Sequence, residues 1–123
     1  MIYWSEDDLR RNAMIYHNVL EAIGETPMIE LQRMARPDMA RVLVKYEGLN
    51  VGGCIKTRTA LNMIEAGEQA GRITPDTIIV EPTSGNQGIG LALIGAVRGY
   101  RTIIIMPDSV SVERRLLVRH YGA

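Results

Sequence analysis

The chain has 123 residues, of which 46% are hydrophobic and 23% are charged, as in an ordinary globular domain. Its 14 basic and 14 acidic side chains cancel, so the charge favours neither nucleic acid nor an anionic membrane as a partner. A single cysteine excludes an internal disulfide, and no apolar run approaches the roughly 18 residues of a membrane span. The acidic N-terminus also lacks a signal-peptide pattern. We therefore expect one cytoplasmic domain.

Residues 1–40 predict a helix followed by a short strand. Ser5 can cap the helix, and Asp8 can complete a capping box three residues later. The helix is expected to end near Ile23 and Gly24, where a glycine and then a proline interrupt the pattern. The stretch "PMIEL" follows as a strand candidate.

Residues 41–123 alternate between strands and helices. The stretches "RVLVKYEG", "TIIVEP" and "RTIIIMP" are rich in β-branched residues and predict strands. A helix is expected from Lys56 to about Ala70, because apolar residues recur there at spacings of three and four, and Gly71 supplies a stop. Two more helices are predicted over "SGNQGIGLALIGAVRG" and "SVSVERRLLVRHYG", the second capped by Ser109 or Ser111.

This alternation is typical of the α/β class. Parallel strands need long crossovers, which are usually helices, and "TIIV" and "TIIIM" lack the polar alternation of half-exposed strands. We therefore predict one partial α/β domain over residues 1–123, in which a parallel sheet carries helices on both faces in three layers. The βαβαβα unit over 41–123 ends on a helix where another strand would normally follow, so the sequence looks incomplete.

Small polar residues crowd the turn "EPTSGNQGIG". Thr83, Ser84, Asn86 and Gln87 surround Gly85 at the start of a helix, whose dipole favours an anion. Because the loop has no basic residue, its neutral donors suit a small carboxylate better than a polyphosphate. The glycine spacing matches neither the dinucleotide fingerprint nor the phosphate-binding loop of nucleotide hydrolases. Alternatively, Ser84 merely caps the helix and the glycines allow tight packing, and the residues leave both interpretations open.

The stretch "NVGGCIK" puts Lys56 in the first turn of a helix. A lysine that forms an imine must lose its proton part of the time, and the positive end of a helix disfavours the ammonium form. Gly52 and Gly53 would let the backbone approach a bound group. Such chemistry points to pyridoxal phosphate, whose aldehyde takes one lysine. A solvated lysine is the alternative, and Lys45 lies in a strand pattern. Both turns should open at the same edge of the sheet.

Three stretches resemble successive blocks of one family. They are "AIGETPMIEL", "VLVKYEGLNVGGCIKTRTALNMIEAGEQAGRI" and "TIIVEPTSGNQGIGLALIGAVRGYRTIIIMPDSVSVERRLLVRHYGA". The family is that of cysteine synthase, the pyridoxal-phosphate enzymes of fold type II in the tryptophan synthase beta-like superfamily, and the resemblance covers about residues 19–123. It implies that Lys56 binds the cofactor covalently and moves the α-proton, and that Asn86 donates to the cofactor's ring oxygen. Donors of the second turn would hold the substrate carboxylate: Thr83, Ser84, Gly85, Asn86 and Gln87.

Four positions depart from the family pattern. The family usually has proline, serine and aspartate where this chain has Val51, Cys54 and Thr57, and usually threonine where it has Gln87. Lys56 is retained, so these departures leave the attachment of the cofactor intact, whereas Gln87 bears on the identity of the substrate. We interpret Cys54 as a small buried residue in place of serine rather than as a redox-sensitive thiol.

The resemblance implies β-replacement, in which sulfide takes the place of acetate on O-acetylserine to give cysteine. Cysteine desulfhydration and the synthesis of cystathionine or lanthionine are alternatives within the family. A non-catalytic α/β module that binds a small anion or a partner is an alternative of another class. Family members are more than twice as long and form homodimers, so we expect a truncated, inactive fragment that binds the cofactor poorly. His17 and His120 lack metal-ligand spacing, and no metal is expected.

Overall fold

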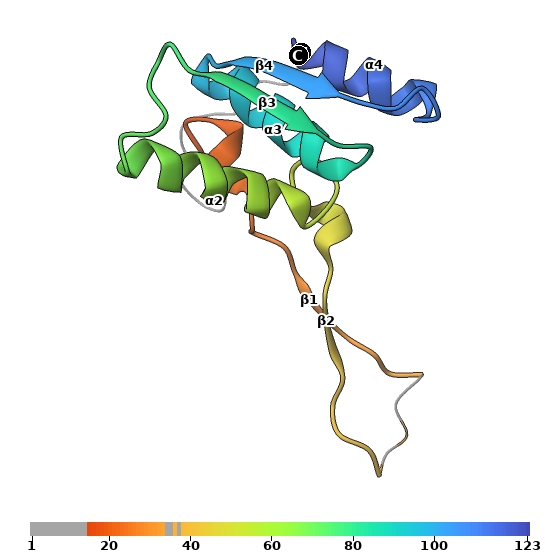
Figure 1. Cartoon of the computed structure of the whole chain (residues 1–123). Helices are drawn as coiled ribbons and strands as arrows, with labels where there is room; N and C mark the ends of the chain where they lie inside the picture. The colour runs from red at the N-terminus through yellow and green to blue at the C-terminus, as the bar shows by residue number, and fades with distance from the viewer. Residues whose placement is uncertain (1–14, 34–35, 37) are drawn as a thin grey trace, which may run out of the picture.

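The computed structural model describes residues 15–33, 36 and 38–123 (Figure 1). The expected start of the first helix, with Ser5 and Asp8, lies outside these residues. The described chain contains a 3-10 helix, η1 (Val19–Ala22), and Asn18 caps it by accepting a hydrogen bond from the Leu20 N–H at 2.9 Å. Residues 15–18 are not helical, so the predicted continuous helix is wrong there; η1 ends just before Gly24, where the sequence predicted a helix end.

The strands β1 (Met28–Glu30) and β2 (Leu43–Lys45) form an antiparallel ribbon that extends away from the body of the molecule (Figure 1). Both strands lie where the sequence predicted them, but β2 was expected in the parallel sheet and is not part of it. Neighbouring strands can pair antiparallel without a crossover, and this pairing satisfies their backbone groups. The sequence pattern predicts a strand here but does not indicate which other strand it pairs with. A second 3-10 helix, η2 (Glu47–Leu49), then leads toward the first long helix.

The strands β3 (Ile78–Pro82) and β4 (Arg101–Ile105) pair in parallel, with α3 (Asn86–Arg98) as the crossover. The helix α2 (Lys56–Gln69) precedes β3, and α4 (Val112–His120) follows β4. These bounds confirm the predicted alternation of helices and strands over this part of the chain. In Figure 1, α2 and α3 both begin at the end of the molecule where the arrows of β3 and β4 finish.

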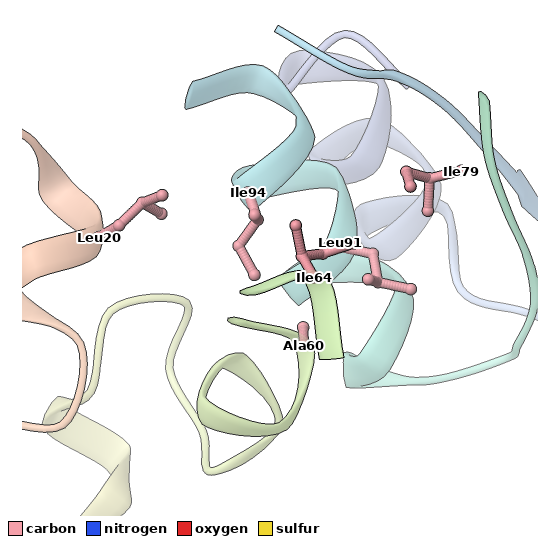
Figure 2. Close-up of a cluster of buried hydrophobic side chains, with 6 residues drawn as sticks. All are labelled: Leu20, Ala60, Ile64, Ile79, Leu91 and Ile94. Atoms are coloured by element: carbon pink, nitrogen blue, oxygen red, sulfur yellow. The ribbon is translucent and has the colours of Figure 1, made fainter. Parts of the chain in front are cut away.

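The main hydrophobic core lies between α2, α3 and the sheet. Figure 2 shows its six buried side chains: Leu20, Ala60, Ile64, Ile79, Leu91 and Ile94. Ile94 and Ala60 are fully buried, so the two long helices meet at the centre of this cluster. A smaller cluster around Ala92 and Val118 packs α4 against α3. The core therefore fixes how α2 and α3 lie relative to each other.

The helices pack on one face of the β3–β4 sheet. Ile79 and Thr102 are buried toward the helices, while four apolar side chains of the other face stay exposed: Ile78, Val80, Ile103 and Ile105. The sequence predicted strands buried on both faces. In the part of the chain that the structure describes, helices cover only the inner face, which explains the difference. No helix among the described residues is long and apolar enough to cross a membrane.

Candidate active site

The turn before α2 places Lys56 at the first residue of that helix. Gly52 and Gly53 have φ values of +79° and +75°, a region that L side chains adopt only at a cost. The Gly53 N–H donates to the Asn50 carbonyl oxygen at 2.8 Å, and the Lys56 N–H donates to the Cys54 Sγ at 3.4 Å. The Lys56 side chain is exposed. The glycines thus set the path of the backbone and leave the amine accessible.

A buried polar network fixes the start of this turn. Asn50 is 4% exposed; its Oδ1 accepts from the Gly24 N–H at 2.9 Å, and its Nδ2 donates to the Cys54 carbonyl oxygen at 3.2 Å. The same Nδ2 donates to Glu47 Oε2 at 3.0 Å. Glu47 in turn accepts two hydrogen bonds from Arg58 of α2, at 2.9 and 2.8 Å. The turn is therefore tied both to the N-terminal segment and to the helix that it opens.

The Glu47 carboxylate is held in its charged form. Hydrogen bonds from Arg58, and further ones from Thr26 and Asn50, lower the pKa of Glu47 to about 2, although partial burial opposes the shift. Arg58 also donates to the Gly24 carbonyl oxygen at 2.8 Å and to the Thr26 hydroxyl at 3.0 Å. Its hydrogen bonds with Glu47 raise the pKa of Arg58. The pair remains ionised at neutral pH.

The first turn of α2 lies against α3. A Cβ added to Gly90 would lie 3.1 Å from the Ala60 Cβ and 3.3 Å from the Lys56 carbonyl oxygen, so a side chain at this position would crowd α2. On the other side of the turn, a Cβ added to Gly52 would lie 2.5 Å from the Thr57 Oγ1. Thr57 is 1% exposed, and its hydroxyl finds no hydrogen-bond partner among the described residues. The Lys56 carbonyl therefore lies close to Gly90 of α3, and the next residue, Thr57, lies close to Gly52.

The turn between β3 and α3 has fewer anchors. The Gly85 N–H donates to the Thr83 Oγ1 at 3.2 Å, and Arg114 of α4 donates to the Ser84 carbonyl oxygen at 3.1 Å. Gly85 is the N-cap residue of α3, and no side chain caps this helix end, so Ser84 does not take the capping role that the sequence left open. A Cβ added to Gly85 would meet no atom within 4 Å. The turn therefore borders open space.

The remaining residues of this turn divide between packing and exposure. A Cβ added to Gly88 would lie 2.9 Å from the Ile104 side chain of β4, which supports the packing role that the sequence left open for the glycines. Asn86 is exposed at the first residue of α3. The Gln87 amide reaches across to α2 and donates to the Met63 sulfur at 3.5 Å. The predicted donors thus gather at one helix start, with Gln87 turned toward α2.

A shallow depression of about 400 Å³ adjoins the turn, lined by Pro82, Thr83, Ser84, Ile105, Met106 and Pro107. It lies at the carboxyl ends of β3 and β4, where ligands of parallel sheets bind. The groups at this end of the molecule fit pyridoxal phosphate and an amino acid: a lysine amine for the aldehyde, hydroxyl and amide donors for oxygen atoms, and a helix start for negative charge.

Two other residues considered in the sequence analysis, Lys45 and Cys54, form contacts within the fold. The Lys45 ammonium donates to the Thr26 carbonyl oxygen, and Cys54 is half-buried beside the Lys56 backbone. The described part of the chain holds no group of three or more His, Cys, Asp or Glu residues that could bind a metal ion.

Sequence reasoning missed the network of Asn50, Glu47 and Arg58. Its hydrogen bonds join residues that are 11 and 26 positions apart, so no periodic pattern marks them. The only local signal is the spacing of three between Glu47 and Asn50, which allows their side chains to meet in one turn.

An exposed lysine at one helix start and neutral donors at another, on a parallel α/β scaffold, fit a pyridoxal-phosphate enzyme of fold type II. Residues 19–123 match the family model described as "Pyridoxal-phosphate dependent enzyme", and the chain belongs to this family.

Similar proteins agree with this family. The cysteine synthase of a Flavobacterium species is 48% identical over 110 residues, which are 89% of this chain and 36% of the relative. The O-ureido-L-serine synthase of Streptomyces lavendulae is 48% identical over 108 residues, 88% of this chain and 33% of the relative. The crystal structure of a hydrogen sulfide-producing enzyme from Fusobacterium nucleatum superposes with a TM-score of 0.82 at 44% identity, over 89% of this chain and 36% of that one.

These matches confirm the predicted family, its α/β fold and its cofactor. The chain spans about a third of the length of the relatives that it matches.

Proposed function

We propose that this chain supplies the lysine and the carboxylate-binding turn of a cysteine synthase-like enzyme, which replaces the acetate of O-acetylserine by sulfide. In this reaction the α-proton leaves, the Cβ–O bond breaks with release of acetate, a Cβ–S bond forms, and a proton returns to Cα. The observation that carries the proposal is the contact between the first turn of α2, which presents Lys56, and α3, which begins at the donor turn.

Lys56 would hold the cofactor through its Nζ and then act on the α-proton. Bound pyridoxal phosphate would supply an electron sink that makes this proton acidic. The Lys56 side chain is exposed while its carbonyl lies against Gly90 of α3, so the amine can move while the main chain stays packed. Once it is free, a neutral amine can accept the α-proton as a general base.

The substrate would bind with its carboxylate at the start of α3. The side chains of Thr83, Ser84 and Gln87 are neutral donors, and the backbone N–H groups of Gly85 and Asn86 lie at the positive end of the helix. The Asn86 side chain, which is exposed, would donate to the ring oxygen of the cofactor. For the proposed reaction, a carboxylate bound here would have to direct the Cα–H bond of the substrate toward Lys56.

Gln87 favours a second candidate reaction at the same site. It stands where the family resemblance places a threonine, and its amide donates to the Met63 sulfur at 3.5 Å, so it would have to leave α2 to reach a carboxylate. The similar enzyme from Fusobacterium nucleatum is described as hydrogen sulfide-producing. Cysteine desulfhydration is therefore the second candidate, and synthesis of cystathionine or lanthionine would use the same groups with another nucleophile.

Trapping of the cofactor tests the role of Lys56. Incubation with pyridoxal phosphate followed by borohydride should place the cofactor on Lys56, as read by visible absorbance and peptide mass. Lys56→Arg should abolish this labelling, and Lys45→Arg is the matched control because the chain has no other lysine. Equal labelling of both lysines, or none, would contradict the proposal and favour the non-catalytic module that binds an anion or a partner.

Product analysis decides between the two reactions. In the complete enzyme we expect cysteine formation from O-acetylserine and sulfide to exceed sulfide release from cysteine, and Gln87→Thr to increase that preference. Faster sulfide release would select the second candidate. We further propose that the complete enzyme is a homodimer, and a monomer in sedimentation velocity would contradict this.

A further inference from the structure

Asn50 is a buried residue at the centre of a hydrogen-bond network, and the proposed reaction gives it no role. Its side chain is 4% exposed and forms hydrogen bonds to three residues: Gly24, Glu47 and Cys54. The three partners come from different segments, namely the stretch after η1, the helix η2 and the glycine turn. A buried amide with these bonds satisfied joins the three segments at one point.

One of these bonds and a main-chain hydrogen bond of Asn50 bear directly on the turn that carries Lys56. The Nδ2 donates to the Cys54 carbonyl oxygen at 3.2 Å, two residues before the lysine, and the backbone carbonyl of Asn50 accepts from the Gly53 N–H at 2.8 Å. Asn50 thus bonds to the turn from both its main chain and its side chain. The positive φ values of Gly52 and Gly53 need such support, because an unanchored glycine turn has many other conformations.

The main chain after Lys56 is also connected to Asn50, through Arg58 and Glu47. Arg58, two positions after the lysine, donates to both oxygens of Glu47, and Glu47 accepts from Asn50. The main chain before and after Lys56 is therefore held through one connected set of side chains. None of these side chains belongs to the groups assigned above to the cofactor or the substrate.

We propose that Asn50 is a positioning residue for Lys56: its buried side chain joins Gly24, Glu47 and Cys54 and so fixes the glycine turn from which the lysine projects. The inference rests on the proposed role of Lys56. The anchoring of the turn can be measured without the cofactor, so the two proposals can fail separately.

Hydrogen exchange of the backbone amides tests the anchoring. In Asn50→Ala, we expect the amides of Gly24 and Gly53 to exchange at least about tenfold faster, as the loss of a buried side-chain hydrogen-bonding group predicts. The buried amide of Ile94 in α3 should keep its protection relative to the global stability. Tyr100→Phe is the matched control, because it removes a 2.6 Å hydrogen bond to Glu68 away from the turn. In this control Gly53 should exchange as in the unaltered chain.

Asn50→Asp distinguishes the role of the accepting side-chain oxygen from that of the donating nitrogen. It keeps an oxygen to accept from the Gly24 N–H, but it loses the donors to Cys54 and Glu47 and sets a carboxylate beside that of Glu47, so Gly53 should be accelerated more than Gly24. Unchanged exchange at Gly53 in both variants would overturn the proposal. An equal acceleration of all amides, or loss of the fold in both variants, would also overturn it, because Asn50 would then serve overall stability alone.

The cofactor reaction supplies the second readout. In the unaltered chain, trapping with pyridoxal phosphate and borohydride should favour Lys56 over Lys45, and Asn50→Ala should bring the ratio of labelling close to one. Tyr100→Phe should leave the ratio unchanged. A ratio near one in the unaltered chain would contradict the role of Lys56 and leave the exchange result standing, whereas a preserved ratio in Asn50→Ala would overturn the positioning role.

Discussion

The two turns of the candidate site are built in different ways. The turn before α2 is held by the buried side chain of Asn50, by the Glu47–Arg58 pair and by the close approach of Thr57 to Gly52. The turn before α3 is held by hydrogen bonds that lie nearer the surface: from the Thr83 N–H to the Ile105 carbonyl oxygen, from the Gly85 N–H to the Thr83 hydroxyl, and from an exposed arginine to the Ser84 carbonyl oxygen. The first turn packs against Thr57 at Gly52, whereas Gly53 of the same turn and Gly85 of the second turn both border open space.

The difference indicates a division of labour. A nucleophile that must meet one atom of a cofactor is best placed on a rigid backbone, because a small displacement costs a large factor in rate. A turn that receives and releases a substrate needs room to move, and loops with few buried contacts supply it. On the proposed function, we therefore expect the lysine turn to be the more rigid half of the site and the donor turn the more mobile half.

The largest difference between the two turns is expected when glycines are replaced by alanine, at Gly52 and Gly53 of the first turn and Gly85 of the second. In Gly52→Ala the new Cβ meets both a positive φ and the Thr57 hydroxyl at 2.5 Å, so we expect a loss of more than about 2 kcal/mol in the free energy of unfolding. Gly53 has a positive φ but open space around it, which predicts a loss of about 1 to 2 kcal/mol. Gly85→Ala should change stability by no more than about 0.5 kcal/mol.

Urea unfolding of the three variants measures this order. Gly85 is the matched control, because its φ of −129° suits any residue and a Cβ there has space. Equal losses at Gly52 and Gly85 would show that the two turns do not differ in rigidity.

Acid should weaken the anchored turn next. The pKa of Glu47 is lowered from 4.5 to about 2 by the hydrogen bonds from Arg58, so its carboxylate binds fewer protons in the folded than in the unfolded chain. Its contribution to stability is therefore complete above about pH 4.5 and is lost as the pH falls toward 2. The urea midpoint of Glu47→Gln should lie below that of the unaltered chain at pH 7 and converge with it toward pH 2.

A matched variant isolates this effect. Glu65→Gln breaks a longer ion pair with Arg98, at 3.4 Å and on the surface, and should change the midpoint far less at pH 7. A difference between Glu47→Gln and the unaltered chain that stays constant from pH 7 to pH 2 would contradict the predicted linkage.

Thr57→Val should stabilise the lysine turn. The Thr57 hydroxyl is buried without a hydrogen-bond partner among the described residues, and a methyl group of similar size has no such requirement. We expect the free energy of unfolding to rise by about 1 kcal/mol, as measured by urea titration. Thr57→Ser retains the hydroxyl and serves as the control, with no gain expected. Destabilisation by valine would mean that the hydroxyl has a partner in solution.

The smallest effect is expected at the open turn. Arg114→Ala removes the exposed hydrogen bond to the Ser84 carbonyl oxygen and should change stability by no more than about 0.5 kcal/mol. The amides of the turn should nevertheless exchange faster, whereas Arg115→Ala, its neighbour on α4, should leave them unchanged. A large loss of stability would assign Arg114 to the framework of the protein.

The sequence predicted the helices and strands from residue 56 onward well, because their signals are local. The helix α2 begins at Lys56 as expected, and β3 and β4 lie in the predicted apolar runs. The partner of β2 could not be predicted, since its three residues fit a ribbon and a parallel sheet equally.

The two candidate turns were also predicted, from glycines and small polar residues that lie next to one another in the chain. The anchors of the lysine turn were not, because Asn50 meets Gly24 across 26 positions and Arg58 meets Glu47 across 11. Contacts of this range depend on how η1, η2 and α2 pack, and a single sequence contains no periodic trace of that packing. Local motifs thus indicated the candidate chemical groups, whereas the structure was needed to find the long-range hydrogen bonds that hold the lysine turn.

The uncovered face of the β3–β4 sheet has a practical consequence for anyone who purifies the chain. Ile78, Val80, Ile103 and Ile105 form an apolar surface, and such surfaces adhere to one another as concentration rises. Salts such as sulfate are excluded from protein surfaces and strengthen this adhesion. We therefore expect aggregation to increase with protein concentration and with added sulfate, so the experiments above are best made on dilute samples in sulfate-free buffer.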